Sequence, residues 1–110
     1  MSLKINGTTI SLTRGDTLKI LIDISNPDGT AYVPIENDSI RFAMKKDYKK
    51  EEVILEKNIP TDSLLLHIEP SDTKQLPQPS DYVYDIQLTH ANGDIDTFIT
   101  GKFKITEEVD

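Results

Sequence analysis

Apolar and polar side chains alternate along most of this 110-residue chain, and turn-forming residues interrupt the alternation at short intervals. Successive side chains of a strand point to opposite faces, so alternation with a period of two indicates strands with one buried face. Segments this short leave almost no place for a helix to start. We therefore predict an all-β domain of about seven to nine antiparallel strands, spaced as in sandwiches and barrels.

Four segments, at 17–24, 40–45, 64–69 and 82–89, carry this alternation most clearly. A weaker strand is expected at 53–57, followed by a turn over 58–63. Within each strong segment the apolar side chains share one face, which predicts that they line a common core. These residues are Leu18, Ile20, Ile22 and Ile24; Ile40, Phe42 and Met44; Leu64, Leu66 and Ile68; and Tyr82, Tyr84, Ile86 and Leu88.

Turn chemistry predicts how the strands connect. The stretch Asn26-Pro27-Asp28-Gly29 favours a chain reversal, because Pro presets φ and Gly tolerates a positive φ. Asn92-Gly93 favours a two-residue type I′ hairpin that pairs 95–100 with 82–89. We expect Gly101 to bend or bulge the last strand before Phe103 and Ile105 continue it.

The two ends of the pattern hold less regular elements. Segments 3–5 and 8–12 flank Asn6-Gly7, which is compatible with a small hairpin or with a kink in one edge strand. Near residues 71–76, Ser71 and Asp72 precede helix-tolerant residues and Pro77 stops them, so one short helical turn is expected there.

The corner before residue 82 resembles the one that leads into the sixth strand of immunoglobulin-like domains, where a tyrosine hydroxyl bonds upstream main chain. Either Tyr82 or Tyr84 suits that role, and filling the core is the alternative. The chain contains no Cys and no Trp, which excludes the antibody type with its Cys, Trp and Cys. The prediction is a single immunoglobulin-like β-sandwich domain over 1–110.

Charge and hydropathy limit the partners. Twelve Lys and Arg against nineteen Asp and Glu leave a net charge of −7, which disfavours a nucleic-acid partner because phosphate is repelled. No apolar run reaches the roughly 20 residues that a membrane-spanning helix needs, so no membrane partner is expected. The absence of Cys suits a reducing cytoplasm.

The residues that carry chemistry are few, and we predict no catalysis, no cofactor and no metal site. His67 and His90 lack the spacing of metal-binding histidines, and both are expected on the surface. Asn92, Asp94 and Asp96 have the alternate spacing of a calcium loop without its closing Glu, so turn formation explains them better.

The run 45–50, with four Lys around Asp47 and Tyr48, is the one basic patch, and a solvated hairpin tip is its preferred interpretation. The alternative function is a small carbohydrate- or ligand-binding sandwich. It requires an aromatic platform, for which Tyr32, Tyr48 and the outward members of the 82–89 strand are the available residues.

Six pieces of strand-and-turn pattern occur along the chain, at 10–17, 26–30, 40–46, 70–73, 82–88 and 101–103. Together they resemble small phage and prophage structural proteins, and are similar to the amino-terminal β-sandwich module of baseplate upper proteins of tailed phages. The resemblance extends over nearly the whole chain. The resemblance implies a virion tail or baseplate part, assembled in the bacterial host cytoplasm, that docks to other virion or tail subunits and has no active site. It does not carry over receptor binding, because the chain ends soon after the last strand.

Unpaired strand edges give the same expectation independently of the resemblance. Residues 3–12 offer an edge that can accept a neighbour's strand, whereas Gly101 and the acidic residues after 106 are expected to protect another edge. The predicted function is protein–protein docking in an assembly, with a ring-shaped homo-oligomer as one form of it.

Overall fold

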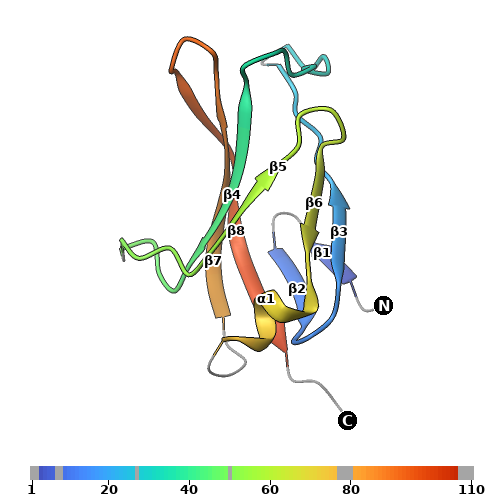
Figure 1. The fold of residues 1–110 in the computed structure, drawn as a ribbon, viewed down its shortest axis with the longest axis vertical. Helices are drawn as coiled ribbons and strands as arrows, with labels where there is room; N and C mark the ends of the chain where they lie inside the picture. Colours follow the sequence, from blue (N-terminus) through green and yellow to red (C-terminus); the bar gives the residue numbers. More distant parts are fainter. Residues whose placement is uncertain (1–2, 7–8, 27, 50, 77–80, 107–110) are drawn as a thin grey trace.

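The computed structural model describes residues 3–6, 9–26, 28–49, 51–76 and 81–106. Within them the chain forms eight strands and one short helix (Figure 1). In chain order these are β1 Leu3–Asn6, β2 Thr9–Thr13, β3 Leu18–Leu21, β4 Ser39–Lys45, β5 Leu55–Ile59, β6 Leu65–Ile68, α1 Pro70–Lys74, β7 Asp81–Thr89 and β8 Ile95–Thr106.

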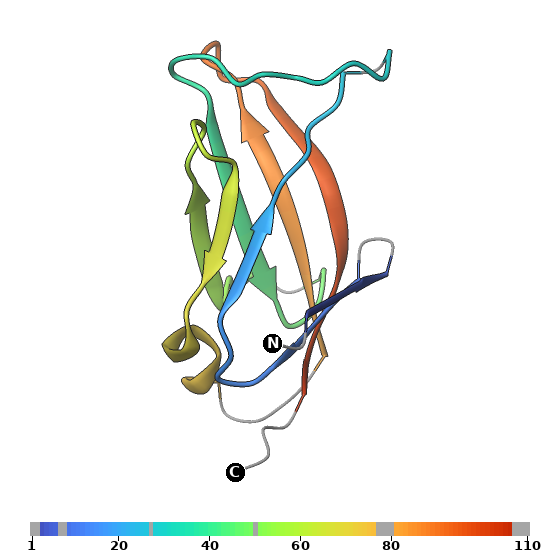
Figure 2. The ribbon, with the colours of Figure 1, turned by 90° about the vertical axis from the view of Figure 1, so that its right-hand side faces the viewer.

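The strands form two layers. Six strands make one sheet in the order β1-β2-β8-β7-β4-β5, and β3 pairs with β6 in a two-stranded sheet. Figure 2 shows the small sheet lying against one face of the large one. The all-β prediction is therefore confirmed.

The core lies between the two layers and is built from the alternating faces that the sequence predicts. Leu18, Leu66 and Ile68 of the small sheet belong to the same buried cluster as the apolar rows of β4, β7 and β8. At its centre the Phe42 ring lies 5.5 Å from the Tyr84 ring and 6.0 Å from the Phe103 ring, between centroids. Burial raises the pKa of the Tyr84 hydroxyl to about 12.

The prediction of purely antiparallel strands is wrong at one place. β2 pairs with β8 in parallel, with Ile10 opposite Phe103 and Leu12 opposite Ile105. Turn signals fix the relative direction of strands that follow one another in the chain, but they place no constraint on two strands from opposite ends of the sequence. The shared burial of Ile10, Leu12, Phe103 and Ile105 is what brings this pair together.

Three strand boundaries differ from expectation. The alternative left open at the start of the chain resolves as a hairpin, because β1 and β2 pair antiparallel, although its turn at residues 7–8 lies outside the described residues. β3 ends at Leu21, earlier than predicted, while Ile22 and Ile24 remain buried. The predicted turn over 58–63 begins too early, since β5 continues to Ile59, whose buried side chain pairs across from Ile40.

The hairpin between β7 and β8 has a different turn from the predicted type I′. Gly93 has a φ of 95°, but Asn92 is not among the residues with positive φ, and the His90 N–H donates to the Asp94 carbonyl. Three residues, Ala91, Asn92 and Gly93, therefore form the loop, as in a type I turn closed by a left-handed glycine.

The prediction of a bulge at Gly101 is also wrong. Gly101 pairs in regular register with Tyr84, and the register shifts between Ile86 and Gln87, which leaves Phe98 as the extra residue on β8. A protective role for Gly101 at a sheet edge stays a prediction, because β2 pairs only with residues 103–106 of β8 and the described pairing of Gly101 is with β7.

The predicted helical turn is present as α1, and it closes one end of the molecule. Pro occupies its first turn, and the Asp72 carboxylate accepts the Glu69 N–H at 2.8 Å and pairs with the Lys57 ammonium at 2.7 Å. The buried Thr73 hydroxyl accepts the Gly15 N–H at 2.8 Å. The Arg14 guanidinium donates to the Lys74 carbonyl at 2.7 Å. We call this region, residues 14–15 and 69–76, the helix end.

Some predicted features lie outside the described residues. These are Pro27 of the first reversal, Lys50 of the basic run, the prolines at 77 and 79, and the acidic residues after 106. For the reversal, the described part agrees with the prediction, since Gly29 has a φ of 90° and its N–H donates to the Asn26 carbonyl.

Candidate functional site

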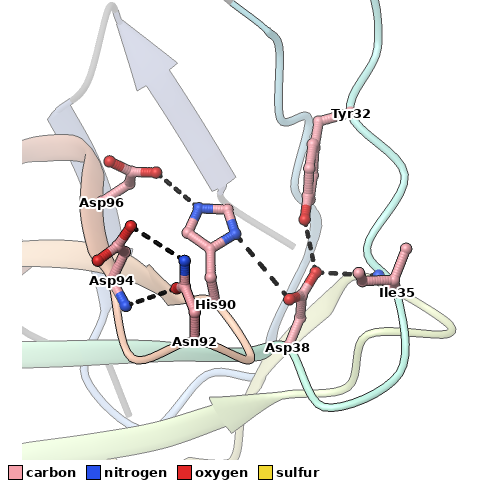
Figure 3. Close-up of polar contacts among 7 residues, drawn as sticks. All are labelled: Tyr32, Ile35, Asp38, His90, Asn92, Asp94 and Asp96. Carbon is pink, nitrogen blue, oxygen red and sulfur yellow. Dashed lines mark hydrogen bonds and ion pairs between the residues drawn. The ribbon is translucent and has the colours of Figure 1, made fainter.

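Two loops lie at the end of the molecule opposite α1 (Figures 1 and 2). They carry a cluster of polar side chains (Figure 3). One loop, residues 31–38, leads from β3 into β4, and the other, residues 90–96, is the β7–β8 hairpin with the start of β8. We call these two segments the tip. The antiparallel pairing of β4 with β7 brings Ser39 opposite Thr89, and this register places the two loops side by side.

Asp38 is the centre of the tip (Figure 3). Although charged, it is only 8% exposed. Its Oδ2 accepts the Tyr32 hydroxyl at 2.6 Å and the Ile35 N–H at 2.9 Å. Two hydrogen bonds to a buried carboxylate fix the shape of the loop over residues 32–38.

His90 joins the hairpin to this loop. Its Nε2 lies 2.7 Å from Asp96 Oδ2, and its Nδ1 lies 4.0 Å from Asp38 Oδ1. The Tyr32 ring meets the imidazole edge-on, with 6.0 Å between centroids. The sequence predicted His90 on the surface. In the structure the imidazole lies at the end of the hairpin and is half-buried, so it is more enclosed than predicted.

The charges of the tip stabilise one another. The hydrogen bond with Asp96 and the nearby carboxylates raise the pKa of His90 against the opposing effect of burial. The Tyr32 hydroxyl and the Ile35 N–H lower the pKa of Asp38, with a smaller contribution from His90. The hydrogen bond between Tyr32 and Asp38 raises the pKa of the Tyr32 hydroxyl, because it favours the protonated phenol. The imidazolium and carboxylate forms therefore support each other.

Asn92 and Asp94 form the hairpin itself. The Asn92 amide nitrogen donates to Asp94 Oδ2 at 3.2 Å, and the Asp94 N–H donates to Asn92 Oδ1 at 2.9 Å (Figure 3). This reciprocal pair of hydrogen bonds stabilises the turn, which is the role that the sequence predicted for these residues. Among the described residues, no group of three acidic or histidine side chains is arranged to hold a metal ion.

The surface around this cluster is apolar and acidic. Three aliphatic side chains are exposed there, Val33 at 75%, Ile35 at 63% and Ile95 at 60%. A hollow of about 440 Å³ lies between the two loops, with Ile35, Asp38 and His90 in its wall. The tip has four carboxylates, at Glu36, Asp38, Asp94 and Asp96, and no Lys or Arg.

The geometry around His90 suits a structural role, in which the cluster makes the tip rigid. Both ring nitrogens of His90 face carboxylates, Nε2 that of Asp96 and Nδ1 that of Asp38, whereas an imidazole that activates a nucleophile has one nitrogen facing a hydroxyl or thiol. The hydrogen bonds instead hold each loop in shape. The two loops are linked by the 4.0 Å contact of His90 Nδ1 with Asp38 Oδ1 and by the edge-on contact of the Tyr32 ring with the imidazole.

Other residues singled out from the sequence lie elsewhere. His67 is exposed on the outer face of the small sheet, opposite Lys19, as predicted. Tyr48, in the loop after β4, is 58% exposed and donates its hydroxyl to the Gly101 carbonyl at 3.1 Å. The Lys46 ammonium lies 5.1 Å from the centre of the Tyr82 ring. Tyr82 and Tyr84 are both buried, and the hydroxyl bond proposed for the corner stays a prediction because residues 77–80 are not described.

The large sheet ends at β1 and β5. β2 is paired on both sides, so within residues 3–12 only β1 offers an outer edge to a neighbour's strand. The opposite edge strand, β5, carries Glu56, Lys57 and Asn58, and polar side chains of this kind discourage strand addition.

Sequence reasoning missed Asp38. Nothing in its neighbourhood distinguishes it from other loop acids, because its partners Tyr32 and His90 lie 6 and 52 positions away. The available signal was the strand pairing: once β4 and β7 are placed side by side, their ends at 38 and 90 must meet.

The chain matches none of the protein-family models with which it was compared, and no curated protein matches it significantly. In the part of the chain that the structure describes, no helix has the length and apolar character to span a bilayer.

Proposed function

We propose that this chain is a non-catalytic assembly module that docks through its tip onto another protein subunit. The observation that carries the proposal is the combination at the tip of three exposed aliphatic side chains with a hydrogen-bonded cluster beneath them. Exposed apolar patches with polar rims are typical of protein interaction sites.

The cluster makes the surface suitable for binding because it removes flexibility beforehand. Loops that must be ordered on association lose conformational entropy and weaken the complex. Here Asp38 fixes the loop that carries Val33 and Ile35, and the His90–Asp96 contact fixes the hairpin beside Ile95.

The charge of the tip selects its partner. The four carboxylates of the tip, which contains no Lys or Arg, repel an acidic surface and attract a basic one. We infer a partner subunit that presents Lys or Arg beside aliphatic side chains. A second copy of the chain offers Lys45, Lys46 and Lys49, so head-to-tail self-association is one form that the test distinguishes.

The resemblance to baseplate modules supports placing this assembly in a phage or prophage tail, with assembly in the bacterial cytoplasm. The strand order supports the immunoglobulin-like part of the same proposal. Taken in chain order, β3 to β8 match strands B, C, C′, E, F and G of variable-type domains. With this matching, the sheet order β8-β7-β4-β5 corresponds to G-F-C-C′, and the pair β3-β6 corresponds to B-E.

The test uses the tip variant Ile35→Ser and the control Leu21→Ser. Leu21 is an equally exposed aliphatic residue, at 70%, but it lies on the small sheet. Multi-angle light scattering over a range of concentrations detects self-association. Affinity capture of the purified proteins encoded beside this gene detects a partner subunit.

We expect Ile35→Ser to weaken the association about tenfold, the loss typical of a buried aliphatic contact, and Leu21→Ser to leave it unchanged. Raising the salt concentration should weaken it further. A strict monomer that binds none of the neighbouring proteins would overturn the proposal, and so would equal losses in the two variants.

A further inference from the structure

A second hollow lies on the face of the large sheet that points away from the small one. It has a volume of about 180 Å³ and is formed by side chains of β4, β7 and the loop after β4. The side chains on which its chemistry depends are Arg41, Lys45, Tyr48, Asp85 and Gln87. We call it the sheet groove.

Asp85 is the unusual member of the sheet groove. Its Oδ1 is buried, and no residue that the structure describes donates a hydrogen bond to it. A buried acceptor without a donor costs free energy that the fold does not recover. Because Asp85 is a half-buried residue on the wall of the groove, a donor that enters the groove is the direct way to satisfy it.

Tyr48 contributes an aromatic side chain to the groove. The bond from its hydroxyl to the Gly101 carbonyl holds the phenol ring in place, although the residue is 58% exposed. Arg41 donates to Glu56 through Nη1 at 3.0 Å, which uses one of the five N–H groups of a guanidinium. The Gln87 amide can donate and accept.

These groups discriminate among ligands. An anion would gain from Arg41 and Lys45 but would lie against the Asp85 carboxylate, and a cation would meet the reverse conflict. A neutral ligand that both donates and accepts hydrogen bonds satisfies all of them. An apolar ligand would leave Asp85 unpaired.

We propose that the sheet groove binds one neutral pyranose unit of a glycan. The C–H face of the sugar would stack on the Tyr48 ring, and its hydroxyls would donate to Asp85 and accept from Arg41 or Gln87. Because Oδ1 is buried, this binding requires a side chain of the groove to move and admit the hydroxyl. The groove shares no residue with the tip, and only Lys45 of the groove belongs to the basic run that head-to-tail self-association would use.

The test measures binding of glucose, galactose and N-acetylglucosamine to the whole chain by ligand-observed and protein-observed NMR, with a glycan array to extend the panel. We expect saturable binding that Tyr48→Ala and Asp85→Ala each weaken at least tenfold. The matched control Tyr32→Phe changes a tyrosine at the tip and should bind as the unmodified chain does. Glucuronic acid should bind more weakly than glucose.

Asp85→Ala also separates binding from folding. Because it removes an unpaired buried oxygen, it should leave the urea midpoint unchanged or raised, so lost binding would not reflect an unfolded chain. Binding that survives both groove variants would overturn the proposal. The absence of saturable binding to every neutral sugar of the panel and array would overturn it as well, without bearing on docking at the tip.

Discussion

The helix end and the tip close the same two layers of strands in opposite ways. At the helix end, Thr73 is fully buried and its hydroxyl accepts the N–H of Gly15, from the loop between β2 and β3. At the tip, the Asp38 carboxylate is buried whereas the aliphatic side chains of Val33, Ile35 and Ile95 are exposed. A surface that served stability alone would place these groups the other way round. The inversion is the main reason to assign recognition to the tip.

The largest difference between the two ends should appear on truncating an aliphatic side chain. Leu76→Ala at the helix end removes a side chain that is 6% exposed and should lower the free energy of unfolding by about 2–5 kcal/mol. Val33→Ala at the tip is the matched control and should change it by less than about 0.5 kcal/mol. Urea denaturation followed by circular dichroism measures both. Equal losses would show that the tip is part of the stabilising core.

A smaller effect is expected from Thr73→Val, which keeps the shape of the side chain and removes the acceptor of the Gly15 N–H. The unpaired N–H should cost about 1–3 kcal/mol. Thr97→Val, on the exposed part of β8, is the control and should leave the urea midpoint in place. An unchanged midpoint for Thr73→Val would mean that the hydrogen bond does not hold the helix end together.

The tip should instead respond to pH. The raised pKa of His90 means that its contribution to stability is complete below the pKa of free histidine, about 6.5, and is lost as the pH rises through the folded value. Because the pKa of Asp38 is lowered, its contribution to stability is complete above the pKa of a free Asp, about 3.9, and is lost as the pH falls through the folded value. Stability from the tip should therefore be greatest between about pH 4 and 6.5.

NMR titration of the His90 ring in two variants sharpens this expectation. Asp96→Asn should lower the pKa of His90 clearly, because it removes the main cause of the shift, whereas Asp94→Asn should lower it only slightly. If the two variants lower it equally, the contact at 2.7 Å is not what stabilises the imidazolium.

The sequence predicted the strands far better than the way they meet. Alternation placed Tyr82, Tyr84, Ile86 and Leu88 correctly on one buried face, because side-chain direction in a strand is a local property. It failed for the parallel β2–β8 pair, which depends on contacts between distant residues.

The same limit applies to the candidate sites. The sequence pointed to His90 and Tyr48 because an imidazole and a phenol are side chains that often bind ligands or catalyse reactions. Asp38 and Asp85 differ from other carboxylates only in having a buried oxygen, and alternation does not predict burial in a short loop or on an outward face. The bulge at Phe98 was missed because an apolar residue carries no signal for it, whereas Gly101 does.

The parallel β2–β8 pair also constrains how the chain is made. Thr13 and Thr106 are 93 positions apart, so β2 leaves the ribosome long before its partner exists. At about 5–20 residues per second, translation leaves β2 without that partner for roughly 5–20 s. During this interval its two apolar side chains, Ile10 and Leu12, have no sheet to cover them. Synthesis of this chain therefore passes through an aggregation-sensitive stage that ends only when its last strand emerges.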